Sequence, residues 1–408
     1  MLGPKLTTRF DIFAHYAHVA ELAMPVAWCS AFAPAEVLLA AGIMPVYPEN
    51  HAAMLGALSP ERNHDKPYSA DAIIRAEEAG YTAPKLCSYA RADIGALIND
   101  AHSPIGGLPK PDLFYACNSQ CSVVARWGDA VQAHCAERGD SIPHFVLHAP
   151  PLRSGEAHSA EAVVAFEAEL RGQVAELCER FGTRFDEDRL AAVTAESAAA
   201  NRLWQRCLQL GAQRPSPWTM FDAFQAMAPI VIARGTQPCT DFYRRLVVEL
   251  ETRVAEGVAA VPNEQRRLLW DAIPIWPRKN WLANFFAERN TAMVVSTYTH
   301  SWWFELDPDR AMRSLCERYA WNTMNRSGQW VLDWTLGLAR DFGCNGIVSH
   351  WNQSCGIWNS YVKRRQAGYR AAGMPQIMIE ADMVDPRAFN ENTIAGQLDT
   401  FIADLAIT

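Results

Sequence analysis

Two segments far apart in the chain, Asn118-Ser119-Gln120-Cys121 and Asn352-Gln353-Ser354-Cys355, carry nearly the same four residues. Each follows a short apolar run, at residues 112–116 and 346–349 respectively. A short apolar or β-branched run, a polar turn and then a helical repeat are typical of a strand that leads into a helix. The sequence therefore predicts two equivalent strand-to-helix junctions, each with a cysteine at the start of its helix.

The stretches after these junctions have apolar residues at helical spacing, at 123–134 and 357–369. A third cysteine, Cys87, opens another helix-like stretch at residues 86–91. Free backbone N–H groups and the helix dipole at a helix N-terminus favour the thiolate, and hence metal binding. Three such cysteines, distant in sequence, suggest one site that is assembled from two halves of a fold.

Composition places the chain among globular proteins and excludes two classes. With 408 residues, 50% hydrophobic and 20% charged, it is long enough for two or three domains. The net charge of −8 argues against a nucleic-acid-binding surface, which would be basic. No run of 18 or more apolar residues is present, and the N-terminus lacks an apolar signal segment, so we expect a cytoplasmic protein.

The order of strand and helix signals predicts four regions. An N-terminal helix is expected in residues 1–25, a first α/β domain in 26–155, a helical region in 156–257 and a second α/β domain in 258–408. Continuous apolar strands separated by helices predict parallel sheets covered on both faces. The expected strands are at 26–28, 44–47, 111–115, 142–147, 267–270, 292–296, 346–349 and 376–379. The expected helices of the third region are at 160–181, 186–210, 218–233 and 241–255.

The expected fold class is thus α/β, with two flavodoxin-like parallel-sheet domains that face each other across a cleft and an additional helical part. Ligands of such sheets bind outside the carboxyl ends of the strands, where Cys121 and Cys355 fall. His300 and His350 also follow strands, which makes a cleft position or a structural hydrogen bond possible for each. No glycine-rich phosphate loop, dinucleotide fingerprint or nucleophile elbow is present, so the chain should not hydrolyse ATP by itself.

The eleven cysteines allow more than one interpretation. A disulfide framework is not expected in a large cytosolic protein. Spacing alone leaves structural thiols as an alternative to a three-cysteine metal site, because it matches neither zinc-finger nor ferredoxin patterns. Cys29, Cys117 and Cys344 lie at element ends and remain possible additional ligands. The five cysteines expected to be inert buried thiols are Cys135, Cys178, Cys207, Cys239 and Cys316.

Seven segments along the chain match, in the same order, the motifs of a known protein family. They are residues 28–36, 47–51, 86–89 with Asp93 and Gly95, 118–121, 269–276, 350–355 and 380–385. Together they resemble the iron–sulfur subunits of the benzoyl-CoA reductase and 2-hydroxyacyl-CoA dehydratase family. The resemblance runs from about residue 26 to the C-terminus, and the helical middle is its least distinctive part.

The resemblance implies a [4Fe-4S] cluster held between two α/β domains by Cys87, Cys121 and Cys355. Ser122 stands where the family often has aspartate, a departure that leaves the neighbouring thiol intact. The family further implies a homologous second subunit, in a heterodimer or larger assembly, and a separate ATP-hydrolysing iron–sulfur activator. This activator delivers one low-potential electron, and the acyl-CoA thioester is reduced to a ketyl-type radical.

The resemblance also assigns candidate catalytic residues. Ser30 and Glu49 match the serine and glutamate that approach the substrate in dehydratase relatives. His350 is a third candidate because of its expected position after a strand and not because of the resemblance. The motif versions favour the benzoyl-CoA reductase type, with an (R)-2-hydroxyacyl-CoA dehydratase subunit as the alternative. A non-catalytic partner subunit with a relay cluster, a double-cubane reductase that recruits further cysteines, and a metal-free flavodoxin-like binding module also remain open.

Overall fold

The computed structural model describes residues 2–60, 66–99, 102–150, 159–360 and 362–407, and it contains two parallel sheets. The first sheet has the strand order β2-β1-β3-β4, and every neighbouring pair is parallel. Its strands are β1 (Val26–Cys29), β2 (Met44–Val46), β3 (Leu113–Cys117) and β4 (His144–Leu147). All five residues of β3 are buried, as expected for a central strand covered on both faces.

The second sheet repeats this arrangement with the order β6-β5-β7-β8, again parallel throughout. Its strands are β5 (Arg266–Asp271), β6 (Thr291–Ser296), β7 (Gly346–Asn352) and β8 (Gln376–Ala381). β3 and β7 occupy the same place in the two sheets, and each ends at one of the two related tetrapeptides. The predicted fold class, all eight expected strands and the equivalence of the two junctions are therefore confirmed.

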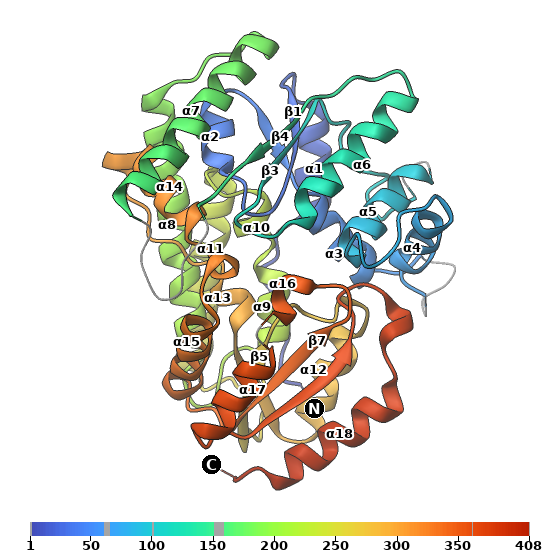
Figure 1. Ribbon diagram of the computed structural model, residues 1–408. Coiled ribbons are helices and arrows are strands. Elements are labelled where there is room, and N and C mark those ends of the chain that lie inside the picture. The colour runs from blue at the N-terminus through green and yellow to red at the C-terminus, as the bar shows by residue number, and fades with distance from the viewer. Residues whose placement is uncertain (1, 61–65, 100–101, 151–158, 361, 408) are drawn as a thin grey trace.

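Helices cover the sheets and connect the two halves. The helices of the first half are α1 (Ile12–Glu21), α2 (Ala35–Ala40), α3 (Pro48–Ala57), α4 (Tyr68–Glu78), α5 (Ser88–Ile98) and α6 (Val123–Glu137). The middle of the chain forms α7 (Ala160–Phe181), α8 (Glu187–Leu210), α9 (Met220–Ala226), α10 (Ala228–Ile232) and α11 (Gln237–Ala255). In Figure 1 the two sheets lie one above the other, and α8 and α11 run along one side of the molecule between them.

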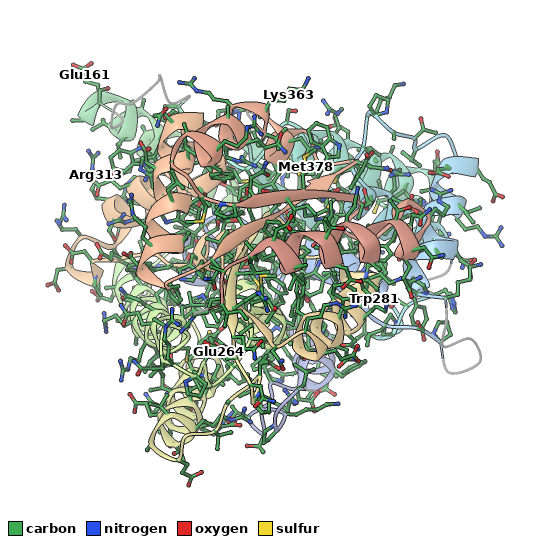
Figure 2. The ribbon with its side chains drawn as sticks, turned by 90° about the horizontal axis from the view of Figure 1, so that it is seen from below. Glu161, Glu264, Trp281, Arg313, Lys363 and Met378 are labelled. Carbon is green, nitrogen blue, oxygen red and sulfur yellow. The ribbon has the colours of Figure 1, made fainter. Side chains whose placement is uncertain are left out.

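The second half carries the remaining helices. They are η1 (Trp276–Arg278), α12 (Lys279–Glu288), α13 (Thr297–His300), η2 (Pro308–Arg310), α14 (Ala311–Ala320), η3 (Thr323–Asn325), α15 (Gly328–Asp341), α16 (Gly356–Asn359), α17 (Val362–Ala371), η4 (Pro386–Ala388) and α18 (Glu391–Asp404). Seen from below, Met378 marks the edge strand β8 and Trp281 marks α12 (Figure 2). One large core, built from both halves and the middle helices, holds the molecule together, and a smaller core lies beside the second sheet.

Two expected helices are interrupted, and the expectation of continuous helices was wrong. The stretch at 357–369 divides into α16 and α17, because Ser360 adopts φ −52° and ψ 135°. The stretch at 218–233 divides into α9 and α10, where Pro229 lacks the N–H that would continue the helix. The expected boundary between residues 155 and 156 lies outside the described residues.

Candidate active site

The three predicted cysteines stand at helix starts, as expected. Cys87 is the N-cap residue of α5, Cys355 is the N-cap residue of α16, and Cys121 precedes Ser122, the N-cap residue of α6. α5 and α6 belong to the first half and α16 to the second. All three cysteines line one cavity of about 390 Å³ that also receives residues from α9 and α10.

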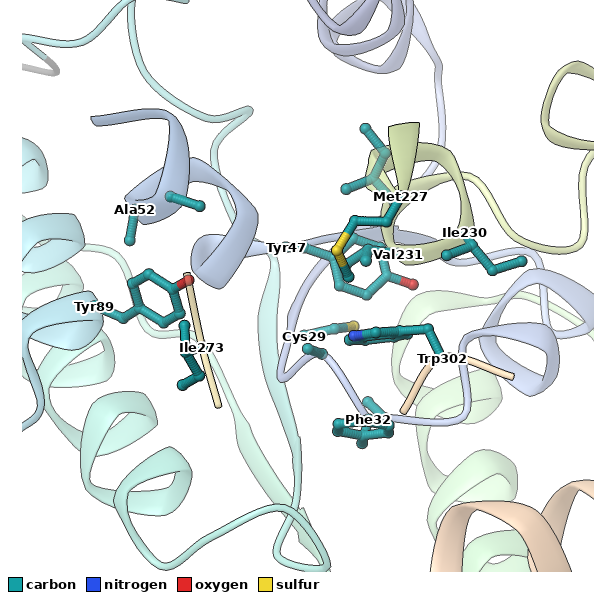
Figure 3. Packing of buried hydrophobic residues seen from close by; sticks show 14 of the residues in the cluster. Cys29, Phe32, Tyr47, Ala52, Tyr89, Met227, Ile230, Val231, Ile273 and Trp302 are labelled. Carbon is teal, nitrogen blue, oxygen red and sulfur yellow. The ribbon is translucent and has the colours of Figure 1, made fainter. Parts of the chain in front are cut away.

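The rest of this cavity is largely apolar, and we name it the acyl cavity after the ligand that we propose for it under Proposed function. Aromatic and aliphatic side chains from all parts of the fold line it: Phe32, Tyr89, Phe224, Met227, Val231, Ile273, Trp276, Tyr298 and Trp302. Figure 3 shows Tyr89 and Ile273 on one side and Phe32 and Trp302 on the other, with Met227 and Val231 nearby. Phe32 and Trp302 are stacked with ring centroids 4.5 Å apart. Such a lining excludes water and suits an apolar ligand.

Burial dominates the acidity of the three thiols. It raises the pKa of Cys87 well above its usual value, that of Cys121 to about 11 and that of Cys355 to about 12. Backbone N–H groups at the helix starts lower these pKa values, but by less than desolvation raises them. The backbone N–H groups at the helix starts thus favour the thiolates, in the direction expected, but burial outweighs them. A bound cation is what would offset the burial of these thiolates.

Glu49 lies in the first turn of α3 and lines the same cavity. Its Oε1 accepts a hydrogen bond from the backbone N–H of Ala31 at 2.8 Å, and its Oε2 accepts one from Nε2 of Gln120 at 2.7 Å. Burial raises the pKa of the Glu49 carboxyl, and these two hydrogen bonds oppose the rise. The result is an oriented acid or base at the wall of an apolar cavity.

Gln120 is a residue whose role the sequence did not reveal. Besides donating to Glu49, its side chain accepts at Oε1 a hydrogen bond from the backbone N–H of Phe32 at 3.2 Å. The side chain immediately before Cys121 therefore fixes both the carboxylate and the loop that carries Phe32. Its place in the tetrapeptide was visible in the sequence, but its partners lie 71 and 88 residues away.

Ser354 connects the two halves beside the cysteines. Its Oγ accepts a hydrogen bond from the backbone N–H of Ser88 at 3.0 Å and donates to Oδ2 of Asp382 at 2.5 Å. Asp382 in turn accepts from the backbone N–H of Val384 at 3.0 Å. Because Ser88 follows Cys87 and Ser354 precedes Cys355, these bonds fix the relative position of two of the three thiols.

Two of the predicted catalytic residues lie elsewhere. Ser30 is buried, and its Oγ accepts a hydrogen bond from the backbone N–H of Cys117 at 3.0 Å; it does not line the acyl cavity. Nδ1 of His350 lies 2.6 Å from the carbonyl oxygen of Ile273, and burial lowers the pKa of this imidazole. His350 thus supports a residue of the cavity wall without lining the wall itself.

The possible additional ligands Cys29, Cys117 and Cys344 do not line the acyl cavity either. Sγ of Cys29 donates to the carbonyl oxygen of Ala27, and Sγ of Cys117 lies 3.1 Å from Oγ of Ser119. Cys344 packs against the smaller core beside the second sheet. All eleven cysteines carry free thiols.

Two kinds of feature are absent from the described ranges. No three histidine, cysteine, aspartate or glutamate side chains in these ranges are grouped to hold one metal ion. No helix in the same ranges is both long and apolar enough to cross a membrane.

In a comparison with known proteins, the chain is similar to subunits of acyl-CoA dehydratases and of a benzoyl-CoA reductase. The family model for the 2-hydroxyglutaryl-CoA dehydratase D-component matches residues 30–405. The (R)-phenyllactyl-CoA dehydratase alpha subunit of Clostridium sporogenes is 27% identical over 382 residues, which cover 93% of this chain and 88% of the relative. The alpha subunit of lactoyl-CoA dehydratase from Anaerotignum propionicum is 27% identical over 397 residues, covering 93% and 89%. The B subunit of benzoyl-CoA reductase from Thauera aromatica is 24% identical over 359 residues, covering 83% and 81%.

Proposed function

The chain belongs to the 2-hydroxyglutaryl-CoA dehydratase D-component family, and on that premise we propose that it is the cluster-binding, substrate-binding subunit of an acyl-CoA dehydratase. Cys87, Cys121 and Cys355 would hold a [4Fe-4S] cluster at the acyl cavity. The observation that carries the proposal is the convergence of these three thiols, from three separate helix starts, on one largely apolar cavity that Glu49 also lines.

The donor set fits a cluster better than a single ion. The three thiols share a cavity but are not grouped tightly enough for one metal ion. In a four-iron cluster each thiolate binds its own iron, so the ligands stand further apart, and three ligands leave one iron open. When bound, such a cluster would supply a low-potential electron and a Lewis acid to a nearby thioester carbonyl.

The chain's own residues would then position the acyl group and move a proton. Phe32, Trp302 and their apolar neighbours would surround the acyl chain and exclude water. Glu49, held by Ala31 and Gln120, would exchange a proton with the part of the substrate that faces it. Its raised pKa keeps the proton bound nearer to neutral pH, which suits delivery to a departing hydroxyl group.

We base the choice between dehydration and ring reduction on the sequence identities to the relatives rather than on the motifs. The two dehydratase alpha subunits share 27% identity with this chain, and the reductase relative shares 24%. We therefore place dehydration of a 2-hydroxyacyl-CoA first, although the sequence motifs favoured ring reduction. Reduction of an aromatic acyl-CoA is the second candidate, because the cavity wall contains stacked aromatic rings that suit a planar ring.

The relatives are named as alpha subunits of dehydratases and as the B subunit of a reductase. We propose accordingly that this chain works with a homologous second subunit and receives electrons from a separate ATP-hydrolysing activator. The absence of a phosphate-binding glycine loop in the sequence agrees with an external source of ATP hydrolysis.

The test is a reconstitution under anaerobic conditions with the homologous second subunit, the activator, ATP and a reductant. An apolar 2-hydroxyacyl-CoA and benzoyl-CoA are supplied separately, and the products are identified by mass spectrometry. Loss of water from the hydroxyacyl thioester supports the first candidate, and a dearomatised thioester supports the second. Turnover of neither substrate, by a complex that contains its iron, would contradict an acyl-CoA enzyme with apolar specificity.

A further inference from the structure

A second cavity of about 240 Å³ lies next to the acyl cavity and has a different character. Aromatic and basic side chains of the segment from α13 to α15 line it: His300, Trp303, Phe304, Arg318, Trp321, Arg326, Trp330 and Trp334. Trp330 and Trp334 are stacked with centroids 5.4 Å apart. Trp303 and Trp330 remain 38% and 36% exposed, so this aromatic cavity opens to solvent.

Arg326 is the unusual group of this cavity. Its guanidinium lies 4.5 Å from the ring centroid of Trp321 and 4.6 Å from that of Trp330. Within the described residues it makes no hydrogen bond or ion pair, and its Nε is buried without a partner. A guanidinium carries five N–H donors in a planar fork, and here two indole rings fix the plane while the donors find no partner among the described residues.

The other arginine of the cavity is already engaged. Nε of Arg318 donates to the carbonyl oxygen of Glu305 at 2.8 Å, and its guanidinium lies 3.4 Å from the Glu305 carboxylate. Arg318 is also a charged neighbour of Arg326, and burial followed by this like charge lowers the Arg326 pKa to about 10. Arg326 is still charged at neutral pH, so a cation without an ion-pair partner in the described ranges faces the cavity, and an anion is the complementary ligand.

The aromatic cavity and the acyl cavity share a wall. Ser301 lines both; Trp302 faces the acyl cavity, and the next residue, Trp303, faces the aromatic cavity. The same alternation occurs around η3, where Met324 lines the acyl cavity and Arg326 lines the aromatic one. A ligand long enough to pass this wall could therefore occupy both cavities at once.

We propose that the aromatic cavity binds the nucleotide end of the acyl-CoA substrate, with the Arg326 guanidinium on a phosphate and the exposed tryptophans against the adenine. This inference rests on the proposed function, because it assumes that the acyl group occupies the acyl cavity. Planar guanidinium groups bind phosphate oxygens through two N–H groups, and indole rings stack on flat heterocycles. The flexible pantetheine arm would cross the wall at Ser301.

The test measures the affinities of CoA and of pantetheine for the iron-loaded complex by anaerobic titration calorimetry. The variant Arg326→Gln removes the charge and should weaken CoA binding about tenfold or more, because charge-assisted hydrogen bonds to phosphate are lost. Pantetheine binding should not change, since this probe lacks the nucleotide. Arg326→Lys keeps the charge without the planar fork, so its CoA affinity should lie between those of the parent protein and Arg326→Gln.

Arg313 on α14 provides the matched control. It lies at the periphery of the molecule (Figure 2), donates from Nε to Glu317 at 3.1 Å and lines neither cavity. Arg313→Gln should leave both affinities unchanged. Iron content and the circular dichroism spectrum of Arg326→Gln report whether that variant is folded, and Trp330→Ala provides a second route to the same loss of CoA affinity.

Several results would overturn the proposal in distinguishable ways. If Arg326→Gln and Trp330→Ala, both folded, bind CoA like the parent protein, the nucleotide end lies elsewhere and the proposed function stands. If the parent protein binds neither CoA nor pantetheine, the proposed function fails and this inference fails with it. If inorganic phosphate or ADP binds in an Arg326-dependent manner while CoA affinity does not depend on Arg326, the aromatic cavity serves a separate anion.

Discussion

The two junctions after β3 and β7 have almost the same sequence, yet their side chains make different hydrogen bonds. In the first half, Gln120 donates to the partly buried Glu49, whereas in the second half Gln353 donates to Glu380, which is exposed on β8. The residues that precede the two cysteines also differ, because Ser354 reaches across to Ser88 of the other half. Both junctions bond across the halves, since Ser119 of the first accepts a hydrogen bond from Nδ2 of Asn322 at 2.8 Å, but the first junction also orients Glu49 at the cavity wall.

This difference shows how a repeated α/β unit can provide an asymmetric site. The strand order and the position of the cysteine are common to both halves, so each half delivers a thiol to the same cleft. The polar residues around each cysteine are free to diverge. In the first half they orient the Glu49 carboxylate, and in the second half they fix the relative placement of two of the thiols.

The largest expected effect is the difference in turnover between variants of Glu49 and of Glu380. Glu49→Gln keeps the shape of the side chain but removes the titratable group, and turnover in the reconstituted system should fall about 10²–10⁴-fold. Glu380→Gln, the matched change at the other junction, should have no effect on turnover. Steady-state kinetics with iron-replete complexes measures both, and activity of Glu49→Gln within about twofold of the parent would remove Glu49 from the mechanism.

The next comparison concerns the two glutamines. Gln120→Ala removes a hydrogen bond that lowers the pKa of Glu49, so that pKa should rise further and the carboxyl should stay protonated to higher pH. The limb of the pH–rate profile that reports Glu49 should move to higher pH, and the rate should change by about tenfold or less, the typical effect of one hydrogen bond. Gln353→Ala should leave the profile in place. Identical profiles for the two variants would contradict the assigned asymmetry.

A smaller effect is expected where Ser354 connects the halves. Ser354→Ala leaves the buried Asp382 and the Ser88 backbone N–H without this partner and should reduce the free energy of unfolding by about 1–3 kcal/mol. Ser360→Ala, near the exposed end of α16, should cost less than about 0.5 kcal/mol. Chemical denaturation compares the two. Equal stabilities would mean that the bridge through Ser354 does not hold the halves.

The smallest effect concerns an ion pair at the surface between the halves. Arg387 of η4 donates to Glu77 of α4 at 2.8 Å and to Asp385 at 2.7 Å. The hydrogen bond from Arg387 lowers the pKa of Glu77; in Asp385, burial raises the pKa and the bonds from Arg387 lower it by more. Carboxylates with depressed pKa values stabilise the fold above their unfolded pKa values near 4, and this stabilisation disappears as the pH falls through the folded values.

Arg387→Gln should therefore cost about 0.5–1 kcal/mol of unfolding free energy near pH 7, since the pair is partly exposed, and progressively less below about pH 4. Thermal or urea unfolding across this pH range measures the difference from the parent protein. A difference that grows as the pH falls would have the wrong sign for this ion pair.

Most of the architecture could be predicted, because both sheets are covered on both faces. Continuous apolar runs such as Leu113–Cys117 mark buried parallel strands, and the repeated tetrapeptide marks the two junctions. The helix at Pro48–Ala57 was not among the predicted elements. The break at Ser360 was also missed, because apolar spacing continues through it and gives no sign of a change in backbone direction.

The site was predictable only in part. A cysteine at a helix start has a local signal, and Cys87, Cys121 and Cys355 indeed share a cavity. The partners of Gln120 and Ser354 lie in other elements, so only the tertiary fold reveals them. Whether a strand-end residue lines the cavity also depends on long-range packing.

The central claim is that three cysteines from two halves hold one cluster, and iron content tests it most directly. Anaerobically purified parent protein should contain about four irons per chain and be brown. Cys87→Ala, Cys121→Ala and Cys355→Ala should each lose most of this iron, whereas Cys29→Ala and Cys344→Ala should retain it. Loss of iron in the last two would indicate a larger cluster. Unchanged iron in all of the first three variants would contradict the account.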